Sequence, residues 1–458
     1  MENNILSCIG NTPLVQLKSV VGDNCAQVFV KCEFMNPTGS IKDRMALHII
    51  EAAEKKGLLK PGGTIVENTS GNTGLSLAMV AAVKGYKAIF TLPDKMSQEK
   101  INMIKSFGAE VVVTPTDVPG DSPDHYVNKA KKIAQNTPNS FYVDQYHNQD
   151  NIEAHYQSTG PEIWDQTNGE FDYFVAGTGT GGTVSGVGKF LKEKNENIKV
   201  IGVDPYGSVH YHYFYTQKLV QPHVYKVEGI GEDILCKAMD FSVVNEMVQT
   251  NDQQAFSMAR RLVREEGLFC GGSSGAIVHA AVELAKTLPR DKKIITLLTD
   301  SGSRYISKFL SDQWMNDHGF LNMENSLGTV NDILVNKDYV PVISINDQSS
   351  IKEAIELMKE SDVSQLPLVN TKNKILGIIH HDDIFDALRS QKIQEHHPVD
   401  SIMQEALGLA SLDTTIEDLY KIFYKGRVAI VLENSKPKAI ITKFDMIEYL
   451  MTKEGKET

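Results

Sequence analysis

Short runs of β-branched and aromatic residues alternate with longer helical patterns from about residue 28 to residue 310. Each run ends in Gly, Ser, Thr or Asp, as at 88–92, 111–113, 173–176, 200–203 and 294–298. Strands that alternate with helices form parallel sheets covered by helices on both faces. We therefore expect an α/β fold, in which ligands bind at the carboxyl ends of the strands.

The C-terminal region contains an internal repeat. In the first copy, Ser350 precedes an apolar stripe at helical spacing, and Glu353 is placed to complete a capping box. Thr415 opens the same pattern in the second copy, and in both copies two apolar strands follow the helix. The repeat predicts an α+β module that is separate from the α/β region.

The chain has 458 residues, more than one hydrophobic core usually serves, so several units are expected. A polar stretch at 316–326 marks the boundary. We predict an α/β domain at 1–318, a linker at 319–337, and the repeated module at 338–458, with copies at about 338–392 and 397–455.

Charge and composition exclude several classes of protein. The net charge is −12 without a basic block, which argues against nucleic-acid and membrane partners. The five cysteines are scattered and the histidines lack ligand spacing, so we expect reduced thiols and no metal site. The N-terminus does not resemble a signal peptide, and no apolar stretch is long enough to span a bilayer, which predicts a cytoplasmic protein.

A lysine lies between a turn and a predicted helix. The turn at 36–39 is followed by Ser40, which we expect to cap the helix, so Lys42 falls in its first turn. The partial positive charge of a helix N-terminus favours the neutral amine that Schiff-base formation needs. This segment alone favours the alternative, a surface lysine paired with Asp43.

A glycine-rich loop at 177–183 follows the run at 173–176. Its backbone N–H groups can converge on a phosphate, and it lacks the lysine of a nucleotide P-loop. Gly177, Gly179 and Gly182 also satisfy the dinucleotide pattern, with Asp204 ending the next strand. A dinucleotide site therefore competes with a simple phosphate cradle.

Two further loops carry hydroxyl groups at predicted strand ends. The loop at 69–74 opens a helix, and such a terminus suits a carboxylate, while Asn72 suits a phenolic oxygen. The loop at 298–303 offers Ser301, a hydroxyl too weakly acidic to protonate a pyridine nitrogen, which favours β-elimination. Each loop taken singly is also consistent with a helix cap or a turn.

The segments at 40–44, 69–74 and 179–183, in this order, resemble the β-family (fold type II) of pyridoxal-phosphate enzymes, the group of cysteine synthase and cystathionine β-synthase. The resemblance covers about residues 5–315 and implies a two-subdomain core that binds pyridoxal 5′-phosphate. It implies cofactor contacts for Lys42, Asn72, Gly179, Thr180, Gly181, Gly182, Thr183 and Ser301. It implies substrate contacts for Thr69, Ser70, Thr73, Gln145 and Tyr146.

The C-terminal tandem resembles a pair of CBS motifs, a regulatory module that often binds S-adenosylmethionine or adenosine nucleotides such as AMP or ATP. Thr442 and Asp445 are similar to its phosphate- or ribose-contacting pair, whereas His380 replaces the first hydroxyl in copy one. One adenosyl site is therefore expected, and a module that serves only dimerisation is the alternative.

The tandem and the segments at 121–123, 144–146, 228–231 and 308–315 resemble cystathionine β-synthases more than cysteine synthases, whereas 159–164 resembles the latter. Animal members carry a haem-binding extension before the core, and here the core begins at 9–14, which implies no haem. They also place a tyrosine where this chain has Glu232, a residue placed to bind the amino group of the second substrate.

The resemblance implies a β-replacement in which serine or O-acetylserine condenses with homocysteine to give cystathionine. Lys42 would act as the base for the α-proton. It also implies a homodimer. The alternatives are a cysteine synthase that uses O-acetylserine and sulfide, and a nicotinamide-dependent dehydrogenase built on the glycine loop.

Overall fold

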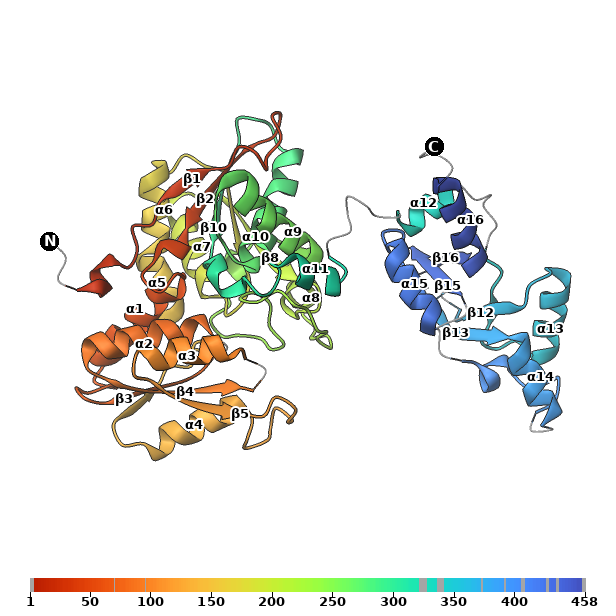
Figure 1. Cartoon of the computed structure of the whole chain (residues 1–458), viewed down its shortest axis with the longest axis horizontal. Coiled ribbons are helices and arrows are strands. Elements are labelled where there is room, and N and C mark those ends of the chain that lie inside the picture. The colour runs from red at the N-terminus through yellow and green to blue at the C-terminus, as the bar shows by residue number, and fades with distance from the viewer. Residues whose placement is uncertain are drawn as a thin grey trace. The chain divides into compact units, whose positions relative to one another are not determined.

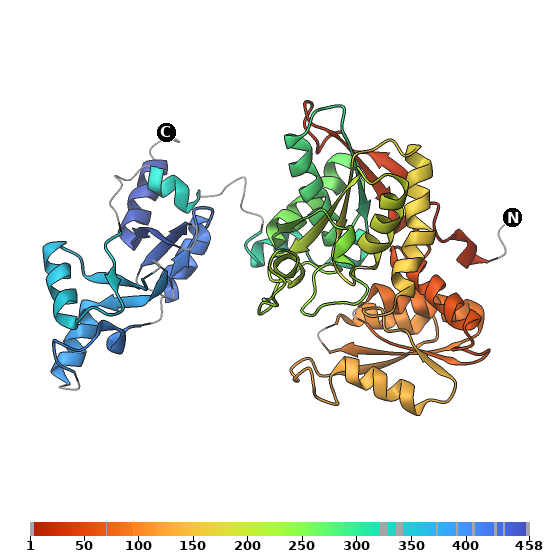
Figure 2. The same ribbon diagram turned by 180° about the vertical axis from the view of Figure 1, so that it is seen from behind.

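The structure is a computed structural model. It describes residues 4–69, 71–94, 96–320, 328–335, 342–371, 374–390, 393–404, 408–425, 428–433 and 436–454. The chain divides into two compact units, Met1–Phe320 and Leu321–Thr458. Figures 1 and 2 show them from opposite sides.

The larger sheet of the first unit has six strands in the order β1-β2-β10-β7-β8-β9. These are β1 (Leu14–Gln16), β2 (Gln27–Cys32), β10 (Lys293–Leu298), β7 (Tyr173–Gly177), β8 (Lys199–Pro205) and β9 (Glu246–Thr250). Only β1 pairs antiparallel; the other neighbours are parallel. These parallel pairings confirm the expected α/β fold with parallel sheets. Apolar strand residues such as Val28 and Phe174 are fully buried in it.

The smaller sheet has four parallel strands in the order β5-β4-β3-β6. These are β5 (Glu110–Thr114), β4 (Lys87–Pro93), β3 (Thr64–Asn68) and β6 (Ser140–Tyr142). Figure 1 shows α1 (Lys42–Lys55), α2 (Asn72–Lys84) and α3 (Gln98–Ser106) on one face and α4 (Tyr126–Asn136) on the other. Helices α1 to α3 therefore lie on the side that faces the larger sheet.

The other helices of the first unit include α9 and α10, which lie in front of the larger sheet in Figure 1, and α7, which lies behind it. They are η1 (Ile5–Cys8), η2 (Glu33–Met35), α5 (Asp150–Gln157), α6 (Thr159–Thr167), α7 (Gly182–Lys194), α8 (His210–Thr216), η3 (Phe241–Val243), α9 (Asp252–Glu266), α10 (Gly272–Thr287), η4 (Gly302–Tyr305) and α11 (Asp312–Asp317). Within the described residues, no helix is both long and apolar enough to cross a membrane.

The second unit contains two three-stranded sheets, β11-β12-β13 and β14-β15-β16. Its elements are α12 (Val330–Val335), β11 (Ile345–Asn346), α13 (Ile351–Glu360), β12 (Gln365–Val369), β13 (Ile375–His380), α14 (His381–Arg389), η5 (Val399–Ile402), β14 (Leu409–Ala410), α15 (Ile416–Lys425), β15 (Ala429–Glu433), β16 (Lys436–Ile441) and α16 (Lys443–Glu454). The capping box is confirmed: the Glu353 N–H donates to Ser350 Oγ (3.2 Å), and the Ser350 N–H donates to Glu353 Oε2 (2.6 Å).

Helix α12 lies within the segment predicted as a linker, 319–337. Val330 and Ile333 are buried in one hydrophobic cluster with residues of α15 and β15, such as Leu419 and Val431. The Val330 N–H also donates to the Thr414 carbonyl (2.8 Å). The polar composition around this short helix obscured it, because its two buried apolar side chains are covered by residues far along the chain.

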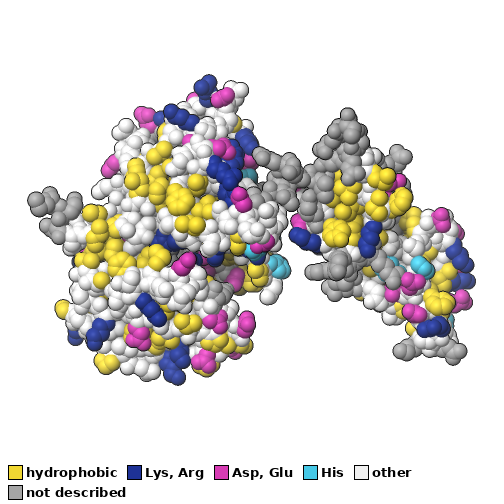
Figure 3. Space-filling model, viewed as in Figure 1, with side chains coloured by type: hydrophobic (Ala, Val, Ile, Leu, Met, Phe, Trp, Pro, Cys, Tyr) yellow, Lys and Arg dark blue, Asp and Glu magenta, His cyan; other side chains and the backbone are white. Residues whose placement is uncertain are grey.

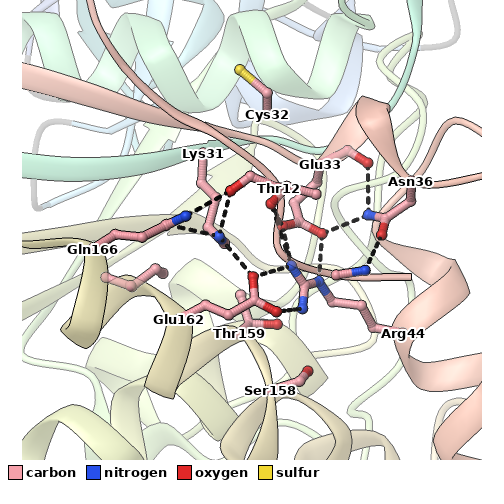
Figure 4. A network of polar contacts seen from close by, with 12 residues as sticks. Thr12, Lys31, Cys32, Glu33, Asn36, Arg44, Ser158, Thr159, Glu162 and Gln166 are labelled. Atoms are coloured by element: carbon pink, nitrogen blue, oxygen red, sulfur yellow. Dashed lines mark hydrogen bonds and ion pairs between the residues drawn. The ribbon is translucent and has the colours of Figure 1, made fainter. Parts of the chain in front are cut away.

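A network of buried charges fixes the start of α1 (Figure 4). Arg44 donates from Nε to Glu33 Oε2 (2.7 Å) and from Nη1 to Glu162 Oε1 (2.7 Å). Lys31 of β2 reaches Glu162 Oε2 (2.8 Å). Burial disfavours the ionised Glu162, but hydrogen bonds from Arg44 and Lys31 lower its pKa to about 2. The network therefore joins β2, η2, α1 and α6.

The substitution Arg44→Met is expected to destabilise the first unit by about 3–5 kcal/mol, because it leaves the buried Glu33 and the partly buried Glu162 without their guanidinium partner. Urea unfolding followed by tryptophan fluorescence measures this, since Trp164 and Trp314 both lie in that unit. The control Lys286→Met removes the exposed pair with Glu283 and should change stability by less than about 1 kcal/mol. Equal effects of the two substitutions would contradict the role of the network.

Candidate active site

A cavity of about 520 Å³ is lined by residues from the helix that starts at Lys42 and from the loops that follow β3, β7 and β10. The carboxyl ends of these parallel strands therefore face a common space, as expected for an α/β fold. The structure brings to this cavity most of the site residues expected from the sequence: Lys42, Thr69, Asn72, Thr73, Gln145, Tyr146, Gly179, Thr180, Gly181, Thr183 and Glu232. Ser70 lies outside the described residues.

Lys42 is the first residue of α1, and Ile41 rather than Ser40 is the N-cap. The Ile41 N–H donates to the Thr299 carbonyl (2.9 Å), which ties the segment before the helix to the end of β10. Among the residues that the structure describes, the buried Ser40 hydroxyl has no hydrogen-bond partner, so the predicted cap does not form. Local sequence favoured the cap, but the contact with β10 determines where the helix begins.

The predicted alternative, a surface pair of Lys42 with Asp43, is not what the structure shows. The Asp43 carboxylate is buried and accepts hydrogen bonds from the Thr38 N–H (2.7 Å) and from Ser76 Oγ (2.6 Å). Burial lowers the pKa of Lys42, although the carboxylates of Asp300 and Glu232 oppose the shift. A neutral amine facing a cavity is a nucleophile and a base.

The glycine loop fits a phosphate group. Gly181 is the N-cap of α7 with φ +91°, a conformation that favours glycine. The Ser185 N–H donates to the Gly181 carbonyl (3.0 Å), so the backbone N–H groups that precede it in α7 have no acceptor within the helix. Gly182 packs closely against Asn151, since an added Cβ would lie 2.0 Å from Asn151 Oδ1, and it is not among the residues that line the cavity.

The loop after β3 presents hydroxyl and amide groups. Thr73 Oγ1 donates to Gln145 Oε1 (2.7 Å), and Thr69 Oγ1 accepts from the Gly71 N–H (3.1 Å). Asn72 Nδ2 donates to Asp300 Oδ2 (2.8 Å), an oxygen that also accepts from the Tyr305 hydroxyl (2.8 Å). These bonds orient a set of polar groups around the cavity.

Glu67 is a buried residue of this region that sequence reasoning missed. Its carboxylate accepts from the backbone N–H groups of Asp144 (2.8 Å) and Gln145 (3.4 Å), and burial raises its pKa to about 8. It therefore fixes the backbone that carries Gln145. A lone acidic residue inside the apolar strand at 64–68 was the available signal.

The structure separates Ser301 from the cavity. Ser301 caps the short helix η4, where its Oγ accepts from the Ser303 N–H (3.3 Å), and it does not line the cavity. Ser273, at the start of α10, does line it, and its hydroxyl lies 2.8 Å from Thr299 Oγ1. The small-residue run at 271–275, of the same kind as the other loops, was the missed signal.

Glu232 lines the cavity, with its backbone N–H bonded to Ser208 Oγ (3.0 Å). Burial and the neighbouring Asp233 raise its pKa to about 8, while Lys42 acts in the opposite direction. The Glu232 carboxyl is therefore mostly neutral at pH 7. Three further residues that line the cavity were missed at the sequence level: Lys100, Glu228 and Tyr305.

The geometry disfavours the dinucleotide interpretation of the glycine loop. Asp204 Oδ1 accepts from Thr178 Oγ1 (2.9 Å) and Oδ2 accepts from the Tyr211 N–H (2.9 Å). Both oxygens of this buried carboxyl are thus used within the fold rather than presented to a ribose.

In the second unit, Thr442 and Asp445 lie together at the start of α16. The Thr442 N–H and hydroxyl both donate to Asp445 Oδ2 (2.7 and 2.8 Å). In the first copy, the His380 N–H donates to Asp383 Oδ2 (2.9 Å), so the backbone cap is the same while the side chain differs. The two copies therefore present different chemistry at equivalent positions.

Residues 5–300 match the family of pyridoxal-phosphate dependent enzymes. Residues 330–390 and 399–452 match the CBS domain. The first match spans the sheets and the cavity, and the second spans the repeated unit and includes α12.

Similar curated proteins include the cystathionine beta-synthase of Dictyostelium discoideum, 38% identical over 477 residues, which cover 99% of this chain and 93% of the relative. The cystathionine beta-synthase of Saccharomyces cerevisiae is 34% identical, with 98% of each chain covered. A cysteine synthase of Staphylococcus aureus is 43% identical over 306 residues, which cover 67% of this chain and 96% of the relative.

The raised pKa of Glu232 predicts a pH dependence of stability. The folded chain holds this proton up to about pH 8, whereas an unfolded glutamate loses it near pH 4.5, so Glu232 lowers stability as the pH rises between these values. Glu232→Gln removes this contribution, and its melting temperature should fall less than that of the unaltered protein between about pH 6 and about pH 9. The exposed Glu110→Gln is the control, and identical pH profiles for all three proteins would contradict the assignment.

Proposed function

The chain belongs to the family of pyridoxal-phosphate dependent enzymes, and from this premise we propose that it catalyses a β-replacement. In this reaction homocysteine replaces the β-substituent of serine or O-acetylserine to give cystathionine, a step of transsulfuration. One observation carries the proposal: a lysine amine of lowered pKa faces the same cavity as a phosphate-binding glycine loop and a hydroxyl loop suited to a carboxylate.

The residues around the cavity suit the cofactor. The loop of Gly179, Thr180, Gly181 and Thr183 would hold the phosphate, with Gly182 supplying a backbone N–H at the start of α7, and Asn72 would face the phenolic oxygen. We assign the ring-nitrogen contact to Ser273 rather than Ser301, because Ser273 lines the cavity beside Thr299. When bound, pyridoxal phosphate supplies an electron sink for loss of the substrate's α-proton and β-substituent.

The protein's own groups perform the remaining tasks. Lys42 Nζ, whose pKa is lowered by burial, removes the α-proton and later returns it. Thr69, Ser70, Thr73 and Gln145 bind the carboxylate of the first substrate, with Gln145 held by Glu67 through its backbone. Tyr146 is partly buried in the wall of the cavity, where it helps to exclude water.

Glu232 lies in the cavity with a carboxyl group that is mostly neutral at pH 7. A neutral carboxyl is a weak partner for an ammonium group, so we revise its expected role from binding an amino group to contacting the substrate as a hydrogen-bond donor.

The choice of cystathionine over cysteine as product rests on the extent of the similarity. The cystathionine beta-synthase relatives match both units of this chain, whereas the cysteine synthase relative matches 67% of it. The regulatory module therefore argues for the first group.

Purified protein loaded with pyridoxal phosphate is expected to be yellow and to form cystathionine from homocysteine with serine or O-acetylserine. Lys42→Ala should lose the colour and nearly all activity, because the amine that holds the cofactor and moves the α-proton is gone. Mass spectrometry of the thioether product and visible absorbance measure both. Cysteine as the sole product, from O-acetylserine and sulfide, would overturn the proposal, and a colourless protein would overturn the assignment of Lys42.

We further propose that the second unit binds an adenosyl ligand at Thr442 and Asp445, whose side chains sit together at the N-terminus of α16. S-adenosylmethionine, AMP and ATP are the ligands to test. Because His380 stands at the equivalent position of the first copy, we propose one site per chain.

S-adenosylmethionine or an adenine nucleotide is expected to raise the melting temperature of the full chain, and Thr442→Ala should reduce that shift because it removes a hydroxyl donor. Thr452→Ala, an exposed change on the same helix, serves as control and should retain the shift. If the shift is absent from the unaltered protein for all three ligands, the module is structural.

We also propose a cytoplasmic homodimer. Hydrophobic side chains gather on one face of the second unit (Figure 3), and Phe444, Ile447 and Met451 of α16 are each more than half exposed, a surface that a second copy can cover.

A further inference from the structure

Three charged side chains form a row beside the cavity. Lys100 of α3 places Nζ 2.5 Å from Glu228 Oε2, and Lys308, which follows η4, places Nζ 2.5 Å from Glu228 Oε1. Lys100 and Glu228 line the main cavity. Lys308 lines instead a smaller adjoining cavity of about 230 Å³. The pair of Lys100 and Glu228 is thus the part of the row that a ligand in the main cavity can reach.

Lys100 lies beside the loop that suits the carboxylate of the first substrate. An ideal Cβ at Gly71 would lie 3.8 Å from Lys100 Nζ, and the same Nζ lies 5.7 Å from the centroid of the Tyr305 ring. Glu228 precedes Gly229, whose carbonyl oxygen would lie 3.1 Å from a Cβ on Gly179. The ion pair therefore extends from the hydroxyl loop toward the glycine loop.

The two glutamates that line the cavity differ in charge. Burial opposes ionisation of Glu228, but Lys100 and Lys308 outweigh it and lower its pKa. Burial and Asp233 raise the pKa of Glu232 to about 8. At neutral pH, Glu228 is therefore ionised, whereas Glu232 is mostly neutral.

A thiol substrate that is itself an amino acid brings a second carboxylate and a second ammonium into the cavity. The loop with Thr69, Thr73 and Gln145 is taken by the first substrate. Among the described residues that line the cavity, the lysines are Lys42 and Lys100, and Lys42 is committed to the cofactor and the α-proton. Lys100 is then the cation for the second carboxylate, and Glu228 is the ionised partner for the second ammonium.

We propose that Lys100 and Glu228 form the receptor for the amino-acid head group of the thiol substrate, with Lys100 Nζ binding the carboxylate and Glu228 binding the ammonium. When a zwitterion binds between these two side chains, the contact of Lys100 with Glu228 is replaced by two contacts, Lys100 with the carboxylate and Glu228 with the ammonium. No charge is left unpaired, since Lys308 remains paired with Glu228. The receptor selects an amino-acid thiol over sulfide, which has no head group. This inference rests on the proposed β-replacement.

Kinetics with two thiols test the receptor. With O-acetylserine as donor, Lys100→Met is expected to raise the KM for homocysteine roughly 10- to 100-fold, the loss of one charge-assisted contact, and to change the KM for sulfide far less. Glu228→Gln should act in the same direction. Lys105→Met, an exposed lysine on the same helix, is the matched control and should change neither constant.

Binding measured without turnover gives a second readout. Cystathionine carries both head groups, whereas S-ethylcysteine carries only the first, and calorimetry compares their affinities. The unaltered protein should bind cystathionine more tightly, and Lys100→Met should bring the two affinities together.

Two results would overturn the receptor. One is an equal loss of affinity for cystathionine and S-ethylcysteine in Lys100→Met, which would place Lys100 on the first substrate or in a structural bridge. The other is an unchanged KM for homocysteine in both variants. An unaltered enzyme that forms cysteine but no cystathionine would instead refute the proposed function itself.

Discussion

The buried ion network around Arg44 is the constraint on which the geometry of the cavity depends. Arg44 sits one helical position beyond Asp43 and ties the start of α1 to Glu33 and Glu162, on η2 and α6. Ion pairs in a protein interior lose much of their Coulomb energy to desolvation, so their main effect is to define one arrangement. Here that arrangement holds the first turn of α1, with Lys42, against the end of β10.

The lowered pKa of Lys42 results from its position in the fold. Burial and the helix N-terminus both disfavour an ammonium ion, and the nearby carboxyl groups of Asp300 and Glu232 limit the shift. Burial raises the pKa of Asp300 as well, and its Oδ2 is shared by Asn72 and Tyr305. Burial therefore disfavours the charged forms of Lys42 and Asp300, whereas the attraction between the lysine and the nearby acids opposes that effect.

The charge of each acidic residue near the cavity depends on its surroundings in the fold and not on its neighbours in the sequence. Within the described part of the chain, Glu67 and Glu232 form no ion pair and their pKa values rise to about 8, whereas Glu228 lies between two lysines and stays ionised. The same residue type therefore fixes a backbone segment at Glu67, lines the cavity as a mostly neutral carboxyl group at Glu232, and forms ion pairs with two lysines at Glu228.

The sequence by itself determined the features that depend on near neighbours along the chain. Strand and helix alternation predicted the parallel sheets, the capping box at Ser350 predicted α13, and the spacing of small residues marked the glycine and hydroxyl loops. The family resemblance added the cofactor, and the matched family agrees with it.

The tertiary structure decided which local signals face the cavity. Ser301 and Ser273 both belong to runs of small residues, but of the two only Ser273 lines the cavity. Strand β10 lies between β2 and β7, and Ser273 is in the first turn of α10 beside the end of β10. Ser40 does not cap α1, because the hydrogen bond from the Ile41 N–H to the Thr299 carbonyl determines where the helix begins. Helix α12 is stabilised because residues of the second repeat bury its apolar side chains. Lys100 pairs with Glu228, which lies 128 positions away along the chain. Patterns of neighbouring residues cannot predict a contact over such a separation.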